Sequence, residues 1–241
     1  MNRLTDVIRK FVRSSAVLIV LAVQMATCEA HDVEQLEADI RQSGPGRFSG
    51  LDLQQVVSAF GLLGIEHILS GFDHLMFVVA LTLMFGFGRK LVWAVTGFTV
   101  AHSVTLALAT LGLLRLPSAP IEAWIALSIV VVSAEALSRR RSMTYRFPFI
   151  VPMMIGLIHG LGFAGALSEI GLPDAYRAAA ILSFNLGVEA GQLGVIGILG
   201  LIARVGMRPS WNIRVRVITL CVFGSVAAYW TIARVWELVT F

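Results

Sequence analysis

The densest group of ionisable side chains in this chain lies in one short stretch, Glu66-His67-Ile68-Leu69-Ser70-Gly71-Phe72-Asp73-His74. The surrounding segments are so apolar that we expect membrane helices there. An ionisable group in the hydrocarbon interior costs about 2.5 to 3.5 kcal/mol on insertion scales, so it persists mainly where it faces an interior site. Imidazole and carboxylate suit a divalent first-row transition metal such as nickel, cobalt or zinc. The stretch therefore predicts metal capture by His67, Asp73 and His74.

Other polar residues stand alone in apolar segments. His102 and His159 are single imidazoles, and Asn185, Glu189 and Gln192 follow at i, i+4 and i+7, which places them on one helical stripe. For an isolated histidine such as His102 an interhelical hydrogen bond is the alternative interpretation. The predicted metal ligands are His67, Asp73, His74, His102, His159, Asn185 and Glu189. Whether Glu122 or His31 joins them is left open.

A shared site requires a break in the chain between two of these histidines. His67 and His74 are seven residues apart, which is about 10.5 Å along a straight helix. Metal–nitrogen bonds are near 2 Å, so one ion cannot reach both. We therefore predict a first helix up to about Leu69, a bend at Ser70-Gly71, and a crossing helix from Asp73 onward.

The composition defines the class of protein that positions these residues. Of 241 residues 57% are hydrophobic and 14% charged, with a mean hydropathy of +0.81; soluble domains are about 25% charged. This is typical of an all-α, multi-pass membrane protein. The net charge of +4 comes from short basic clusters between apolar spans, which argues against nucleic-acid binding. Two cysteines, Cys28 and Cys221, are too few for a thiolate zinc site or a disulfide framework.

The N-terminal region divides into two parts before the membrane domain. Residues 1–30 have a basic start, an apolar run over 16–26 and a small-x-small site at Cys28-Glu29-Ala30, which predicts a cleaved signal peptide. An uncleaved anchor helix is the alternative. Residues 31–52 are polar and predict a short periplasmic tether, and residues 53–241 predict the membrane domain.

The membrane domain contains enough apolar sequence for six transmembrane helices. Basic breaks at 89–90, 139–146 and 204–216 are each separated by two spans, so the positive-inside rule places all three in the cytoplasm. The mature N-terminus is then periplasmic, the membrane is the bacterial inner membrane, and the predicted ligands fall in the outer half of the bilayer. The apolar stretches are 53–88, 91–114, 119–138, 147–167, 176–203 and 214–238.

Two glycine pairs predict close helix packing. Gly156 with Gly160, and Gly187 with Gly191, match G-x-x-x-G. We expect this packing to bring His159 close to Glu189.

The motifs together resemble those of the HupE/UreJ family of multi-pass membrane proteins. His67-x5-Asp73-His74 is similar to the H-x5-D-H signature of that family, and the resemblance continues through 101–106, 159–164 and 184–192. It covers about residues 55 to 200. At a second motif of the better-known nickel members only His159-Gly160 is kept. The resemblance implies a nickel or cobalt permease associated with hydrogenase or urease maturation.

Three functions follow from these residues. The first is a permease that takes a divalent metal, nickel or cobalt and otherwise zinc, from the periplasm through an intramembrane His/Asp/Glu site. The second is an intramembrane zinc hydrolase, with Glu189 or Asp73 as general base. The third is a metal sensor or insertion factor. We expect a transporter rather than an enzyme, with the metal ion and the lipid bilayer as partners; protein partners and oligomeric state stay open.

Overall fold

The computed structural model describes residues 52–114, 117–138, 142–170, 172–206 and 209–240. Within these residues every regular element is a helix, as predicted. The elements are α2 (Leu53–Ser70), α3 (Phe72–Phe85), α4 (Arg89–Thr110), α5 (Ser118–Ser138), α6 (Met143–Arg146), α7 (Ile150–Ile170), the 3-10 helix η2 (Asp174–Tyr176), α8 (Arg177–Gly206) and α9 (Pro209–Thr240). The predicted signal peptide and nearly all of the predicted tether lie outside the described residues.

The predicted break between the first two helices is confirmed. Asp52 caps α2, because its carboxylate accepts from the Gln55 backbone N–H at 2.8 Å while Gln55 Oε1 accepts from Asp52 N–H at 3.1 Å. The helix ends at Ser70, Gly71 is extended, and α3 leaves at 74° to α2. A Cβ on Gly71 would lie 2.8 Å from the carbonyl oxygen of His67, so this tight bend requires glycine.

Within the part of the chain that the structure describes, four helices are long and apolar enough to cross a membrane: α4, α5, α8 and α9. The bent pair of α2 and α3 passes the same test when the two are taken together. The apolar part of α7 over Ile150–Phe163 is shorter than a full span. The polytopic class is therefore confirmed, while the count of six spans stays a prediction.

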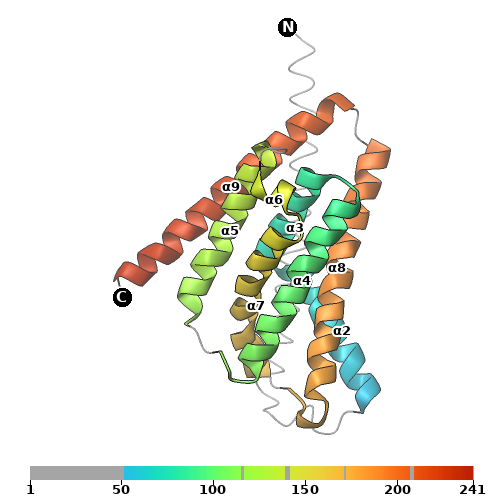
Figure 1. Cartoon of the computed structure of the whole chain (residues 1–241), viewed down its shortest axis with the longest axis vertical. Helices are drawn as coiled ribbons and strands as arrows, with labels where there is room; N and C mark the ends of the chain where they lie inside the picture. Colours follow the sequence, from blue (N-terminus) through green and yellow to red (C-terminus); the bar gives the residue numbers. More distant parts are fainter. Residues whose placement is uncertain (1–51, 115–116, 139–141, 171, 207–208, 241) are drawn as a thin grey trace. The chain divides into compact units, whose positions relative to one another are not determined.

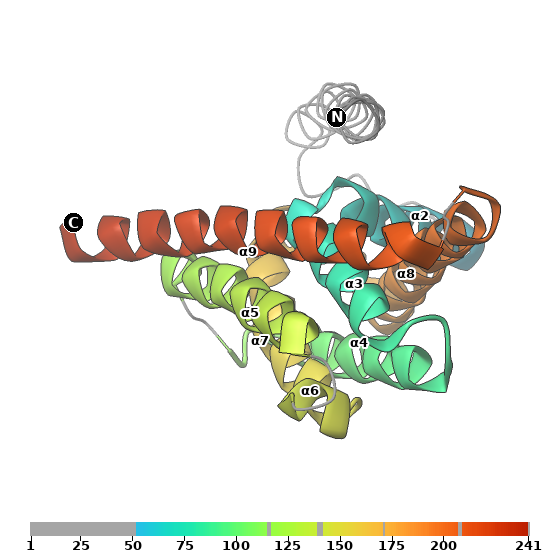
Figure 2. The same cartoon turned by 90° about the horizontal axis from the view of Figure 1, so that it is seen from above.

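The principal helix pairs join segments that are far apart in the sequence. α4 packs most extensively on α7, α2 on α8, and α5 on α9. Figure 1 shows α2 beside α8, and Figure 2 shows α9 along one face of the bundle over α3 and α5. The most extensive helix contacts thus join helices that are not consecutive in the sequence.

Glycines bring the helices of two of these pairs into backbone contact. A Cβ on Gly64 would lie 2.0 Å from the Phe184 carbonyl oxygen, and one on Gly187 would lie 2.0 Å from that of Gly61. At the α4–α7 interface, a Cβ on Gly156 or Gly160 would lie 2.3 or 2.4 Å from a carbonyl oxygen of α4. The close packing predicted from the glycine pairs is confirmed.

The partners of these glycines differ from those we expected. α7 uses its pair against α4, whereas α8 uses its pair against α2. The two pairs therefore serve separate interfaces, and the expectation that they bring His159 to Glu189 is wrong. Sequence pattern identifies a small-residue face but not the helix that packs on it.

Candidate metal site

Four imidazoles from four helices meet inside the bundle. His67 lies on the last turn of α2 and His74 on the first turn of α3, so the bend at Gly71 brings their ring centroids to 4.6 Å. The ring of His102 on α4 is 6.1 Å from that of His67 and 6.0 Å from that of His74. The ring of His159 on α7 is 5.1 Å from that of His74. We call these four residues the imidazole cluster.

Burial of the cluster is nearly complete. His74, His102 and His159 are 3%, 0% and 1% exposed, and His67 is partly buried. A buried polar nitrogen without a partner costs free energy, so the hydrogen-bond partner of each ring nitrogen has to be identified.

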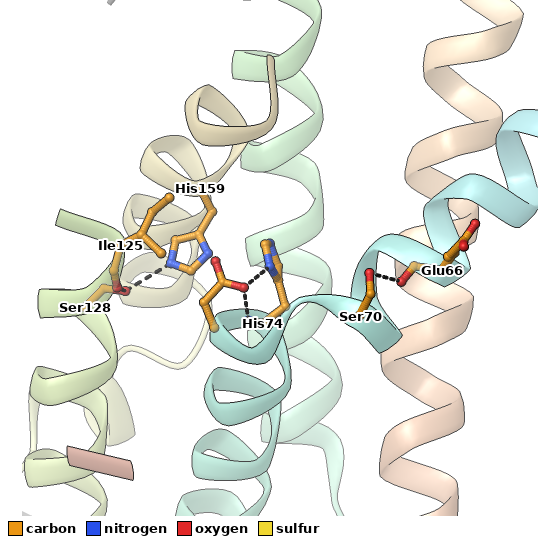
Figure 3. A network of polar contacts seen from close by, with 7 residues as sticks. Glu66, Ser70, His74, Ile125, Ser128 and His159 are labelled. Carbon is orange, nitrogen blue, oxygen red and sulfur yellow. Dashed lines mark hydrogen bonds and ion pairs between the residues drawn. The ribbon is translucent and has the colours of Figure 1, made fainter. Parts of the chain in front are cut away.

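Asp73 orients the ring of His74. The Oδ1 atom of Asp73 accepts from the backbone N–H of His74 at 2.8 Å and lies 2.9 Å from its Nδ1. Because a carboxylate oxygen only accepts, Nδ1 carries the proton and Nε2 carries the lone pair. Figure 3 shows His74, at the start of α3, near His159, which extends from α7.

Asn185 orients the ring of His102 in the same way as Asp73 orients that of His74. Its Nδ2 donates to the Ile181 carbonyl at 2.8 Å, which turns its Oδ1 toward His102 Nδ1 at 3.3 Å. The amide oxygen accepts the Nδ1 proton, so the lone pair of this ring is also on Nε2.

Ser128 of α5 orients the ring of His159 but fixes the opposite tautomer. Its hydroxyl donates to the Ile125 carbonyl at 2.7 Å, so its proton is already used. Ser128 Oγ therefore accepts from His159 Nε2, 3.0 Å away (Figure 3), and the lone pair of His159 is on Nδ1.

The nitrogens that carry these lone pairs have no partner. Among the described residues, the buried side-chain atoms without a hydrogen bond include Nε2 of His67, His74 and His102 and Nδ1 of His159. In three of the four rings, the atom left over is thus the one that can bind a metal. A ring held by one nitrogen with the other offered to an ion is the usual arrangement of a metal-ligating histidine.

Among the described residues, the donors form two overlapping groups that lie close to ion-binding range. One consists of His67, His74 and His102, and the other of Asp73, His74 and His159; in each, one ligand atom per residue lies within 4.8 Å of the others. Two ligands of one ion lie at most about 4.2 Å apart, since each bond is near 2.1 Å. Small side-chain shifts would bring either group onto one ion. His74 belongs to both.

Aromatic side chains enclose the cluster on two sides. Phe163 and Phe184 lie 4.0 and 5.5 Å from the ring of His67, and Phe98 lies 5.1 to 6.0 Å from the other three rings. Phe98 belongs to one apolar core and Phe184 to another. The imidazoles therefore occupy the gap between two hydrophobic cores, where water is largely excluded.

The remaining predicted ligands lie around the cluster rather than in it. Asn185 binds His102, and Glu189 is in neither donor group: its Oε1 accepts from Thr96 Oγ1 at 3.0 Å. Glu122 forms an ion pair with Arg234 at 2.8 Å. Sequence reasoning missed Ser128, because a serine in an apolar helix has no signal of its own until its neighbour is known.

A cavity of about 420 Å³ is lined by residues of α3, α5 and α9 and includes Asp73, the partner of His74. We call it the α9 cavity; it is lined by Phe72, Asp73, Glu122, Ile125, Ala126, Trp230, Ala233, Arg234 and Glu237. Asp73 lies in its wall while binding His74, so one carboxylate joins the cavity to the imidazoles. Arg234 bridges Glu122 and Glu237 there.

The bundle of membrane-spanning helices with these buried imidazoles defines a polytopic membrane protein with a candidate transition-metal site. The family profile described as HupE / UreJ protein matches residues 48–234. The chain belongs to the HupE/UreJ family, as its motifs predicted. No curated protein and no solved structure matched it.

Proposed function

We propose that this protein is a permease that carries a divalent transition metal, nickel or cobalt, across the inner membrane from the periplasm. The observation that carries the proposal is the set of unpartnered, lone-pair nitrogens in the imidazole cluster. Such nitrogens at the centre of an apolar bundle are costly unless an ion binds them. Membership of the HupE/UreJ family, which is generally linked to nickel and cobalt transport, supports the same function.

The donor set favours nickel or cobalt as cargo. Neutral imidazole nitrogens suit borderline divalent ions, whereas Cu(I) prefers thiolate and thioether sulfur. Cys221, the cysteine within the described residues, lies on the exposed side of α9. The Asp73 carboxylate adds one negative charge beside His74, which offsets part of the cost of a divalent ion in the membrane interior.

The α9 cavity supports a route for the ion. Its wall contains Asp73, Glu122 and Glu237, so a hydrated cation entering it meets carboxylates before it meets imidazoles. Asp73 is the point of transfer, because the same side chain faces the cavity and His74.

One observation favours the alternative of an intramembrane zinc hydrolase. Three imidazoles, those of His67, His74 and His102, leave a fourth position open, as in catalytic zinc sites. The candidate bases are less favourable, because Asp73 is bound to His74 and Glu189 to Thr96. Transport therefore accounts for more of the polar residues.

The experiment is Ni²⁺ uptake by purified protein in liposomes loaded with a metal-sensitive chelating dye. We expect dye signal with the wild type and none above empty liposomes with His74→Ala. Binding of Ni²⁺ without uptake would favour a sensor or insertion factor. Absence of both would reject the proposed function.

The proposed direction of uptake depends on the orientation of the protein in the membrane. That orientation is tested by cysteine labelling in a background with Cys28 and Cys221 replaced by serine. Ser118 and Met143 are both exposed and lie at opposite ends of the α5–α6 region. In intact cells we expect an impermeant thiol reagent to modify Ser118→Cys from the periplasm and to spare Met143→Cys. The reverse pattern would place the α9 cavity on the cytoplasmic side.

A further inference from the structure

A second group of polar side chains lies at the interface of α4 and α8. Thr96 and Thr99 are three residues apart on α4, and Glu189 and Gln192 are three apart on α8, so each pair shares a helix face. Thr96 Oγ1 donates to Glu189 Oε1 at 3.0 Å, and Thr99 Oγ1 lies 3.0 Å from Gln192 Oε1. The two faces therefore meet through four oxygen-bearing side chains, which we call the oxygen station.

The station continues the line of the imidazole cluster. Thr99 and Thr96 lie three and six residues from His102, about 4.5 and 9 Å along α4. Glu189 lies four residues beyond Asn185, about 6 Å along α8. Both steps lead toward the helix ends that carry Arg89 and Arg204, the ends predicted to be cytoplasmic.

Gln192 supplies an independent sign that this group binds a ligand. The residue is 1% exposed, and its Nε2 is a buried nitrogen without a hydrogen-bond partner in the described ranges. Turning the amide by 180° exchanges its oxygen and nitrogen without changing its shape. Nε2 then donates to Thr99 Oγ1, whose own proton can go to the Val95 carbonyl 3.2 Å away. The amide oxygen is then left as a buried acceptor that is available to a cation.

The chemistry of the station differs from that of the cluster. Carboxylate, carboxamide and hydroxyl oxygens bind borderline transition-metal ions less tightly than imidazole nitrogens do. An ion that only met the imidazoles would be held rather than released, since conduction needs sites weak enough to leave. Glu189 also supplies negative charge in the membrane interior, where a divalent ion needs it.

We propose that Thr96, Thr99, Glu189 and Gln192 form a second, oxygen-only binding station, which receives the divalent ion from the imidazole cluster on its way inward. This inference rests on the proposed function. In this scheme the imidazole nitrogens bind the ion tightly, and the oxygens of the station bind it weakly enough for release.

The test compares binding with transport in the same variants. Glu189→Gln keeps the shape of the side chain and an oxygen for Thr96, and removes only the charge. We expect its Ni²⁺ uptake into dye-loaded liposomes to fall by roughly an order of magnitude. Its Ni²⁺ affinity, measured by titration calorimetry on purified protein, should equal that of the wild type.

A matched pair of threonine variants guards against effects of misfolding. Thr99→Val should slow uptake as Glu189→Gln does. Thr82→Val is the control, because the Thr82 hydroxyl donates to Val78 of its own helix and lies on α3; it should transport like the wild type.

Two outcomes would contradict the proposal of an oxygen station. Wild-type uptake in both Glu189→Gln and Thr99→Val would remove these residues from the path. A loss of affinity in step with the loss of uptake would make Glu189 a ligand of the imidazole site. The proposed function fails separately, through His74→Ala protein that binds Ni²⁺ normally or wild-type protein that takes up none.

Discussion

The imidazole cluster and the α9 cavity both gather ionisable side chains, but they differ in how those side chains are satisfied. In the cluster, each ring has a nitrogen that finds no partner within the described part of the chain. In the cavity, Arg234 is paired with Glu122 and Glu237, and all three are between 40% and 49% exposed. Ion pairs between solvent-exposed side chains contribute little to the free energy of folding. Unpartnered nitrogens in a dry interior are costly, and on this ground we propose that an ion binds there.

The largest expected effect is at the residue that both donor groups share. His74→Ala removes one ligand from each group and leaves the Asp73 carboxylate without its imidazole. We expect calorimetry to detect no Ni²⁺ binding by the variant, while its expression stays near that of the wild type; Asp73→Ala should behave in the same way. Glu122→Gln, in the cavity, is the control and should bind normally. Normal binding by His74→Ala would contradict the assignment of the cluster.

A second prediction separates the two donor groups. His67→Ala leaves the group of Asp73, His74 and His159 complete, whereas His159→Ala leaves that of His67, His74 and His102 complete. We therefore expect each single variant to bind Co²⁺ with reduced affinity and the double variant not to bind it. The visible absorption bands of bound Co²⁺ should differ between the single variants, because one group contains a carboxylate. Identical spectra would mean that one group alone holds the ion.

A third prediction concerns the residues that orient the rings. Ser128→Ala and Asn185→Ala each remove the acceptor that fixes one ring and its tautomer. Loss of such a partner costs about 10- to 100-fold in metal affinity, which calorimetry can resolve. Ser133→Ala is the matched control on α5, since its hydroxyl is also buried but binds no ring. Equal affinities for Ser128→Ala and Ser133→Ala would show that His159 needs no support from α5.

The smallest effect is expected in the α9 cavity. Arg234→Gln frees the carboxylates of Glu122 and Glu237, which makes the cavity more negative. The initial rate of Ni²⁺ uptake should rise by less than about tenfold at low salt, and the gain should vanish at high ionic strength. Arg204→Gln changes the net charge equally at the far end of α8 and should have no such effect. A fall in rate would indicate that Arg234 holds the cavity open.

Local pattern was sufficient to predict the helices and the bend. The hydropathy of the spans and the glycine at position 71 are properties of single segments, and the distance between His67 and His74 required a break there. The expectation that the four histidines share one region followed from the depth in the membrane that we predicted for each. These predictions depend on the chain near each residue and on the bilayer, both of which can be inferred from sequence.

The partners across helix interfaces could not be predicted in the same way. Ser128 beside His159 and Thr96 beside Glu189 lie on helices that meet only in the folded bundle. Arg234 and Glu122 join α9 to the start of α5. Which small-residue face packs on which helix is decided by the sum of many weak contacts, and no short motif encodes that sum.

The close packing of α2 on α8, where Gly64 meets Phe184 and Gly187 meets Gly61, has a consequence for the order of synthesis. α2 is made and inserted early, but the helix whose backbone it must touch is among the last to leave the ribosome. At roughly 5 to 20 residues per second, α2 waits for several seconds with its glycine groove unfilled. During that time the membrane insertion machinery or a chaperone must shelter the groove from other nascent helices. A chain that stops before α8 can never close it, and quality-control proteases should remove such a fragment before it meets a metal ion.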